Sequence, residues 1–287
     1  MIQPLCLLVS ILPFRRIVTG TLLLLSAVCL LVSCATLSPS GVGRVKEYVV
    51  ENEDIPPAFD GFKLAFVSDL HYPSLFSHKR LVKLVSCLKD LSPEVLLLGG
   101  DYVTSPDSIA PLFATLSSVA PEYGIYAVPG NHDRRNLSQM SAAMHGNGIT
   151  LLQNRWQELC KGGDTIFIAG ADDSFAVDTL SLSFASQFSS EAFVVLLAHT
   201  PDYAENNSTT ADIVLSGHTH GGQVSLFGLY TPVKNTAYGT RFLRGRNRAS
   251  SGADVITTNG VGTSRKPLRF WVPSEIVVVT LKCVQQP

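Results

Sequence analysis

The chain has few charged residues and no excess of basic ones. Charged residues make up 16% of its 287 residues, and the formal net charge is −1. A general nucleic-acid-binding protein usually carries a basic stripe, so we expect no nucleic-acid partner. There is also no internal repeat and no low-complexity tract. The length and the 46% of hydrophobic residues fit one large globular domain with an accessory segment.

Cysteines are too sparse to form a framework. Beyond the first 34 residues the chain has Cys87, Cys160 and Cys283, at wide spacing. An odd number of widely spaced cysteines excludes a disulfide scaffold and a zinc knuckle. We therefore expect these three thiols to lie in the core.

A long hydrophobic run lies near the amino end. In "RRIVTGTLLLLSAVCLLVSC" (residues 15–34), two arginines precede apolar and small residues that end at Cys34. This order is typical of an export signal, and the last four residues resemble a bacterial lipobox, in which Cys34 would be acylated. The run is also long enough to remain as a membrane helix. In either case residues 1–34 are predicted to be a signal sequence or membrane anchor. The protein would then be associated with the bacterial inner membrane as an anchored protein or a lipoprotein.

Residues 35–60 are predicted to form a linker and an edge strand, and residues 61–287 the main domain. In the main domain, short apolar runs alternate with stretches of helical periodicity. Near-continuous apolar runs such as "VLLLGG" and "FVVLLA" are typical of strands that are covered on both faces. "HKRLVKLVSCLKDL" (residues 78–91) instead has apolar residues at helical spacing. This alternation predicts an α/β sandwich with mixed sheets.

Residues that can bind metal ions follow directly after five of the predicted strands. Because the carboxyl ends of strands in open α/β sheets line one crevice, these residues are expected to converge there. One such residue alone would usually be a turn former, but histidines do not recur at successive strand ends for that reason. His78 and His145 lie elsewhere and are interpreted as ordinary surface or helix residues. The strand-end residues are Asp69, His71, Asp101, Asn131, His132, His199, His218 and His220.

The donor types indicate the chemistry. Carboxylate, carboxamide and imidazole groups without a thiolate suit Mn, Fe or Zn, and they disfavour a structural zinc site. There are too many donors for one ion, so we expect two divalent ions about 3.5–4 Å apart that share one carboxylate. Such a pair lowers the pKa of a shared water and neutralises the charge that develops during in-line attack on phosphorus. The pattern therefore predicts a metal-dependent phosphoester hydrolase.

Five blocks together resemble the calcineurin-like metallophosphoesterases. They occur in the family order and cover residues 62–282. The resemblance implies a four-layer α/β/β/α sandwich and a metal-dependent hydrolase. The blocks are "DLH" at residues 69–71, "GGD" at 99–101, "GNHD" at 130–133, "AH" at 198–199 and "GHTH" at 217–220.

The resemblance also implies roles for individual residues. The first ion would be held by Asp69, His71, Asp101 and His220. The second would be held by Asp101, Asn131, His199 and His218, with Asp101 as the bridge. His132 resembles the family histidine that contacts the phosphate and protonates the leaving oxygen, and Asp133 resembles its orienting partner. No ligand position departs from the family pattern.

The layout is similar to that of the membrane-anchored bacterial branch of the family, which has an N-terminal anchor and a late "GVGTS" block (here residues 260–264). That branch resembles phosphodiesterases and the UDP-2,3-diacylglucosamine pyrophosphatases of lipid A synthesis. A lipid-linked phosphoester and membrane lipids are therefore expected partners, and no protein partner follows from the sequence. Four arginines are predicted to bind a second phosphate or an anionic headgroup, unless they form a solvated basic face. They are Arg241, Arg244, Arg265 and Arg269.

Two alternatives stay open. The first is an exported lipoprotein phosphodiesterase with a small or envelope phosphoester substrate. The second belongs to another class, a catalytically silent binding module tethered to the membrane. Metal-dependent hydrolysis of bis-p-nitrophenyl phosphate separates the enzyme from the silent module.

Overall fold

The structure, a computed structural model, describes residues 16–26, 35–37, 41–172, 188–206 and 211–284. Within these residues, no helix is both long and apolar enough to cross a membrane. A helix at residues 16–26 belongs to the predicted signal or anchor segment. Cys34, the predicted lipidation site, lies outside the described residues.

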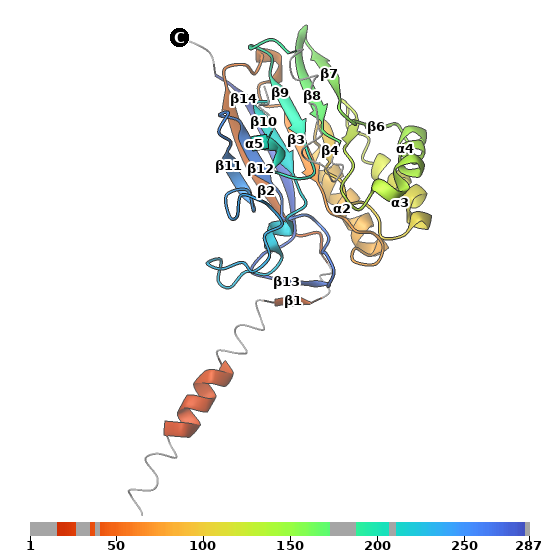
Figure 1. The fold of residues 1–287 in the computed structure, drawn as a ribbon. Coiled ribbons are helices and arrows are strands. Elements are labelled where there is room, and N and C mark those ends of the chain that lie inside the picture. Colours follow the sequence, from red (N-terminus) through yellow and green to blue (C-terminus); the bar gives the residue numbers. More distant parts are fainter. Residues whose placement is uncertain (1–15, 27–34, 38–40, 173–187, 207–210, 285–287) are drawn as a thin grey trace, which may run out of the picture.

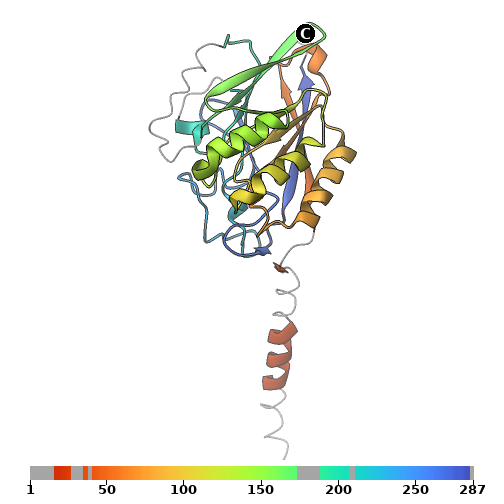
Figure 2. The ribbon, with the colours of Figure 1, turned by 90° about the vertical axis from the view of Figure 1, so that its right-hand side faces the viewer.

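The first sheet has six strands and one helical face. β14 runs antiparallel to β3, and the other neighbours are parallel. In sheet order the strands are β2 (Arg44–Asn52), β14 (Glu275–Cys283), β3 (Lys63–Val67), β4 (Val95–Leu98), β5 (Ile125–Ala127) and β6 (Ile149–Leu151). The helices that cover its outer face are α2 (His78–Leu91), α3 (Ile109–Ser117) and α4 (Leu137–Gly146) (Figures 1 and 2).

The helices pack on the sheet through apolar residues that recur at helical spacing. In α2, Leu81, Leu84, Val85 and Leu88 are buried against the first sheet, at the predicted helical spacing. Helix α4 was not predicted from the sequence. It buries Met140 and Met144, and apart from Leu137 its other positions are small or polar, so its apolar stripe is too narrow to stand out as a periodic pattern.

The second sheet also has six strands, and it packs face to face with the first. Its two edge pairs are antiparallel and its inner neighbours are parallel. Phe66 and Leu97 from the first sheet and Val195 and Ile256 from the second share one buried cluster. In sheet order the strands are β11 (Gly245–Arg248), β12 (Asp254–Thr257), β10 (Ile213–Ser216), β9 (Val194–Leu197), β8 (Asp164–Gly170) and β7 (Arg155–Lys161). The expected mixed sheets are thus confirmed.

The outer face of the second sheet is covered differently. Among the described residues, the short helix α5 (Tyr203–Asn206) and loops lie over it, with Tyr203 and Phe242 fully buried there. A complete fourth layer of helices stays a prediction. In the described part of the chain the structure also has short 3-10 helices, namely η1 (Pro57–Phe59), η2 (Pro106–Ser108), η3 (Arg134–Asn136) and η6 (His220–Gly222).

A small two-stranded sheet joins the amino-terminal part of the chain to the domain. β1 (Ala35–Leu37) pairs antiparallel with β13 (Leu268–Phe270), and Ala35 lies opposite Phe270. Figure 1 shows this pair at the lower end of the domain.

One expectation about the thiols was wrong. Cys87 and Cys283 are half-buried, but Cys160 is exposed. Cys160 lies on β7, which is an edge strand of the second sheet. An edge strand packs on fewer sides than a central strand, so the position of Cys160 in a strand does not bury it.

Candidate metal centre

The predicted ligands lie where strands of both sheets end. Asp69 and His71 follow β3, Asp101 follows β4, and Asn131 follows β5 in the first sheet. The remaining ligands follow two parallel strands of the second sheet. They are His199 after β9, and His218 and His220 after β10. Because the two sheets pack face to face, these loops meet at one shared rim, as the strand-end pattern predicts.

One donor cluster consists of Asp69, His71 and His220, all buried. The Nε2 atoms of the two histidines lie 3.2 Å apart, and His220 Nε2 lies 3.3 Å from Asp69 Oδ1. Within the described residues, Asp69 Oδ1 is buried and has no hydrogen-bond partner. Buried polar atoms in proteins nearly always have a partner, so a divalent cation fits this cluster.

A second donor cluster surrounds Asp101. Asp101 Oδ2 lies 3.4 Å from His199 Nε2 and 3.6 Å from His71 Nε2 in the first cluster. The Nδ1–H of His199 donates to the Gly99 carbonyl at 2.6 Å, which leaves its Nε2 lone pair directed toward Asp101. Asp101 thus stands between the two clusters, in the position that a bridging ligand requires.

His218 and Asn131 are joined by a direct contact. His218 Nδ1 lies 2.9 Å from Asn131 Oδ1, and the His218 ring lies edge-on to the ring of His199 at 5.1 Å. His220 instead stacks on the ring of His71. The two histidines of "GHTH" therefore have different ring neighbours, His199 for His218 and His71 for His220.

The electrostatics of the centre favour the forms that bind cations. Burial lowers the pKa of His220 to about 3 against the opposing charge of Asp69, and burial also lowers the pKa of His71. Both imidazoles are therefore neutral at pH 7 and have a lone pair to offer. Burial alone would raise the pKa of Asp101, but the neighbouring histidines, His199 foremost, hold it below its ordinary value. His71 and His220 are thus neutral donors beside an ionised Asp101, which are the forms that bind a cation.

The backbone of the centre is strained. A positive φ is uncommon for residues other than glycine, and such conformations cost on the order of 1–3 kcal/mol each. Their concentration at one rim shows that the surrounding structure holds these loops in place for the site. The ligands concerned are Asp69 (φ 60°), His71 (49°), Asp101 (57°), His218 (64°) and His220 (51°).

Asp133 differs from its predicted role. Its buried carboxylate accepts hydrogen bonds from the backbone N–H groups of Asp101 (2.7 Å), Tyr102 (3.0 Å) and Gly130 (2.8 Å). These backbone groups are its hydrogen-bond donors among the described residues. Asp133 therefore positions the loop of the bridging ligand, and the prediction that it orients the His132 ring is corrected. Burial and the charge of Asp101 raise its pKa to about 7.

His132 lies at the open side of the centre. Its side chain is 59% exposed, and its Nε2 lies 4.0 Å from Asp101 Oδ2. Its backbone N–H donates to Asp101 Oδ1 at 2.9 Å. A partly exposed imidazole next to Asp101 is accessible from solvent, and its role as a proton donor stays a prediction.

The four predicted substrate-binding arginines do not form one group. Arg269 is 2% exposed, and its guanidinium donates to the carbonyl groups of His220, Asn259, Gly260, Gly262 and Val272. The guanidinium thus holds the His220 loop through these hydrogen bonds. The prediction that Arg269 binds a phosphate or headgroup is corrected. Arg241 forms an ion pair with Glu205 at 2.9 Å and is likewise committed to a structural contact.

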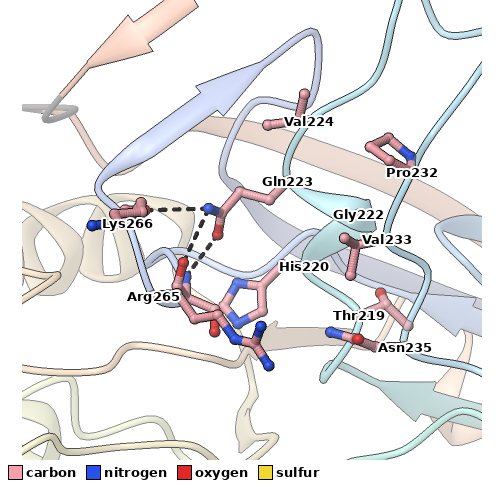
Figure 3. Close-up of a pocket in the computed structure, with 11 residues that line it drawn as sticks. Thr219, His220, Gly222, Gln223, Val224, Pro232, Val233, Asn235, Arg265 and Lys266 are labelled. Atoms are coloured by element: carbon pink, nitrogen blue, oxygen red, sulfur yellow. Dashed lines mark hydrogen bonds between the residues drawn. The ribbon is translucent and has the colours of Figure 1, made fainter.

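Arg265 and Arg244 lie nearer the centre. Arg265 lines a cavity of about 300 Å³ next to His220, together with Lys266, Gln223 and Asn235 (Figure 3). Arg244 donates to the Gly221 carbonyl at 3.3 Å, beside the ligand loop. For these two arginines, binding of a second phosphate or an anionic headgroup stays a prediction.

Gln223 is a positioning residue that the sequence prediction missed. Its Nε2 donates to the carbonyl groups of Ser264 (3.1 Å) and Lys266 (3.2 Å), and its Oε1 accepts from the Ser264 N–H (2.7 Å). Figure 3 shows these contacts holding the loop that carries Arg265 against the cavity. The only signal in the sequence was its place directly after "GHTHGG".

Comparisons with known proteins agree with this geometry. Residues 62–222 match the calcineurin-like phosphoesterase family. The chain is 32% identical over 246 residues to YkuE, an uncharacterized metallophosphoesterase of Bacillus subtilis, with 82% of this chain and 84% of that protein covered. It is 30% identical over 250 residues to an uncharacterized metallophosphoesterase of Aquifex aeolicus, with 83% and 92% covered. The chain therefore belongs to the calcineurin-like phosphoesterase family, and it is a metal-dependent phosphoesterase.

One further relative is a protein whose name includes a transmembrane part. The "transmembrane protein with metallophosphoesterase domain" of Danio rerio is 27% identical over 258 residues, with 83% of this chain and 57% of that protein covered. This chain thus matches little more than half of that relative.

Proposed function

We propose that the protein is a dinuclear phosphoesterase that hydrolyses a phosphodiester or a pyrophosphate at a membrane surface. The observation that carries the proposal is the position of Asp101. Its Oδ2 lies within 3.6 Å of histidines from both donor clusters. A carboxylate shared in this way supports two ions rather than one.

Each ion would have its own donor set. Asp69, His71, Asp101 and His220 would hold the first. Asp101, Asn131, His199 and His218 would hold the second. When bound, two divalent ions of Mn, Fe or Zn supply an activated water and neutralise charge on the phosphoryl group.

The protein residues provide the remaining steps. His132, exposed at the mouth of the centre, donates a proton to the leaving oxygen. Asp133 holds the backbone of Asp101 and Gly130 in place through its three hydrogen bonds. Arg269 fixes the His220 carbonyl and so the loop of that ligand.

The cavity beside His220 supports a substrate with a second anionic group. Arg265 and Lys266 are exposed on one wall, and Gln223 holds the loop that carries them. A phosphomonoester would leave these cations without a partner, whereas a phosphodiester or pyrophosphate with a further phosphate would pair with them. A nucleotide-linked lipid such as UDP-2,3-diacylglucosamine satisfies this requirement.

The membrane location rests on the hydrophobic run at residues 17–33. The relative from Danio rerio, which is named a transmembrane protein, agrees with it. Mass spectrometry of the mature amino terminus and protease accessibility in spheroplasts test the location. An acylated Cys34 on the outer side would rule out the nucleotide-linked lipid and favour an exported lipoprotein phosphodiesterase.

The chemistry is tested by hydrolysis of bis-p-nitrophenyl phosphate with Mn²⁺ present. The wild-type chain should hydrolyse it, and Asp101→Asn should lose turnover because the shared ligand is weakened. Asp107→Asn is the matched control, because Asp107 is exposed on η2 and its loss should leave the rate unchanged. Absence of turnover with any divalent ion would contradict the proposal and favour a silent binding module.

A further inference from the structure

Several large apolar side chains are exposed at one end of the domain. Leu229 is 92% exposed, and Phe227, which is 55% exposed, packs its ring 5.6 Å from that of Trp271. Soluble domains seldom leave such residues together on the surface without a partner. We call this set the apolar rim, and it consists of Leu226, Phe227, Leu229, Tyr230, Val233 and Trp271.

The apolar rim is built into the fold and is not a loose loop. The N–H of Leu226 donates to the Tyr230 carbonyl at 2.7 Å, which closes a tight turn. The N–H of Ser225 donates to the Phe270 carbonyl at 2.9 Å, so the turn is fastened to β13 next to Trp271. The rim therefore presents its side chains outward from a fixed backbone.

The rim lies beside the point where the amino-terminal segment joins the domain. Phe270 of β13 pairs with Ala35 of β1, directly after the hydrophobic run of residues 17–33. Figure 1 shows β1, β13 and the loop after η6 at the same end of the molecule. A membrane that receives the amino-terminal segment would thus face the apolar rim.

The charge of this part of the chain fits an anionic surface. Between residues 213 and 274 there are eight basic residues and one acidic residue, Asp254, although the whole chain has a net charge of −1. Arg246 pairs with that one carboxylate, Arg241 pairs with Glu205, and Arg269 is buried. Arg265 and Lys266 stay exposed at the cavity. Basic residues beside an apolar surface are attracted to anionic lipid headgroups.

We propose that the apolar rim docks into the surface of an anionic lipid bilayer and holds the cavity beside His220 against the headgroups. The inference rests on the membrane location in the proposed function, but not on its chemistry. Tryptophan and tyrosine favour the membrane interface because their rings are apolar and carry one polar group. Val233 belongs to both the rim and the cavity wall, so a substrate headgroup could reach the cavity without leaving the bilayer.

The two tryptophans of the chain allow a direct test with the full chain. Trp271 belongs to the rim, and Trp156 packs against Phe167 in the second sheet. Trp156→Phe leaves Trp271 as the reporter, and Trp271→Phe leaves Trp156. Each variant is mixed with vesicles of phosphatidylglycerol and phosphatidylcholine whose acyl chains are brominated, so that lipid contact quenches fluorescence.

We expect Trp271 emission to fall at least about twofold, because its ring enters the interface, and Trp156 emission to stay unchanged. Adding Phe227→Ser and Leu229→Ser should restore Trp271 emission. Val82→Ser should not restore it, since Val82 is 52% exposed on α2 and does not belong to the rim. An unquenched Trp271, or equal quenching of both tryptophans, would overturn the docking and point to a protein partner instead.

The failure of this inference is distinguishable from failure of the proposed chemistry. Hydrolysis of soluble bis-p-nitrophenyl phosphate should be unaffected by Phe227→Ser and Leu229→Ser, because neither residue lines the cavity. Hydrolysis without quenching would overturn the docking alone. Quenching without hydrolysis would overturn the chemistry alone.

Discussion

The Nε2 atoms of His71 and His220 lie 3.2 Å apart. Because burial lowers the pKa of both rings, both are neutral, and Asp69 Oδ1 lies 3.3 Å from the nitrogen of His220. Such a convergence of donor atoms stabilises a cation and is otherwise unfavourable in a protein interior. The short distance between these two nitrogens therefore marks the position where a cation would bind.

His132→Gln should lower kcat by about 10²–10⁴-fold, the usual contribution of a general acid. Metal content should stay unchanged, because His132 is exposed and lies in neither donor cluster. Steady-state kinetics together with metal analysis measure both effects. His145→Gln, which changes an exposed histidine on α4, should leave both values unchanged. A His132 variant with wild-type kcat would remove it from the mechanism.

Gly130→Ala should weaken metal retention by about tenfold or more, in the range found when groups that support metal ligands are disturbed. A Cβ at this position would lie 2.3 Å from Asp101 Oδ1, so the bridging carboxylate must move. Gly146→Ala is the matched control, since a Cβ there meets nothing within 4 Å. Dialysis against a chelator followed by metal analysis compares the two variants. Equal metal retention in both would contradict the tight packing around Asp101.

Arg269→Met should lower the free energy of unfolding by about 3–5 kcal/mol, because it leaves several buried carbonyl groups unpaired. Arg265→Met should change the free energy of unfolding by less than about 0.5 kcal/mol, since its side chain is exposed. We expect Arg265→Met to raise KM instead. Urea unfolding and kinetics together separate the two roles. Similar stability in the two variants would contradict a structural role for Arg269.

Asp212, which is not one of the predicted metal ligands, should make the stability of the fold depend on pH. Asp212 accepts hydrogen bonds from the Val194 N–H (2.8 Å) and the Asn52 side chain (2.9 Å), and burial raises its pKa from 3.8 to about 6. Between these pKa values the folded state binds a proton that the unfolded state lacks. The free energy of unfolding should therefore fall as pH rises through this window, by up to about 3 kcal/mol.

Asp212→Asn tests this effect because it removes the titrating group. Urea unfolding of the wild type and the variant at about pH 4.5 and about pH 7 gives the change in stability for each. We expect a smaller change in the variant than in the wild type. The same change in both proteins would show that Asp212 does not titrate in this window.

The strand ends could be predicted from the sequence because apolar runs and metal-binding residues occur in a fixed order along the chain. Asp69, Asp101 and His199 were placed in this way, and the structure brings them together. The role of Arg269 could not be predicted, because backbone carbonyl acceptors leave no signal in the sequence. Asp133 was misjudged for the same reason, since it binds backbone N–H groups.

The apolar rim was also not predicted. Leu229 lies in an apolar stretch that reads like any other buried segment, and only the tight turn between Leu226 and Tyr230 exposes it. Exposure depends on how the loop leaves the second sheet, which is a property of tertiary packing. The local amino-acid composition therefore does not predict the exposure of Leu229.

The most direct test of the central claim is electron paramagnetic resonance of the protein loaded with Mn²⁺, with metal content measured on the same sample. The shared position of Asp101 predicts two ions per chain and a spectrum of exchange-coupled Mn²⁺. Asp101→Asn should lose the coupling. One ion per chain with an uncoupled spectrum in the wild type would contradict a dinuclear centre.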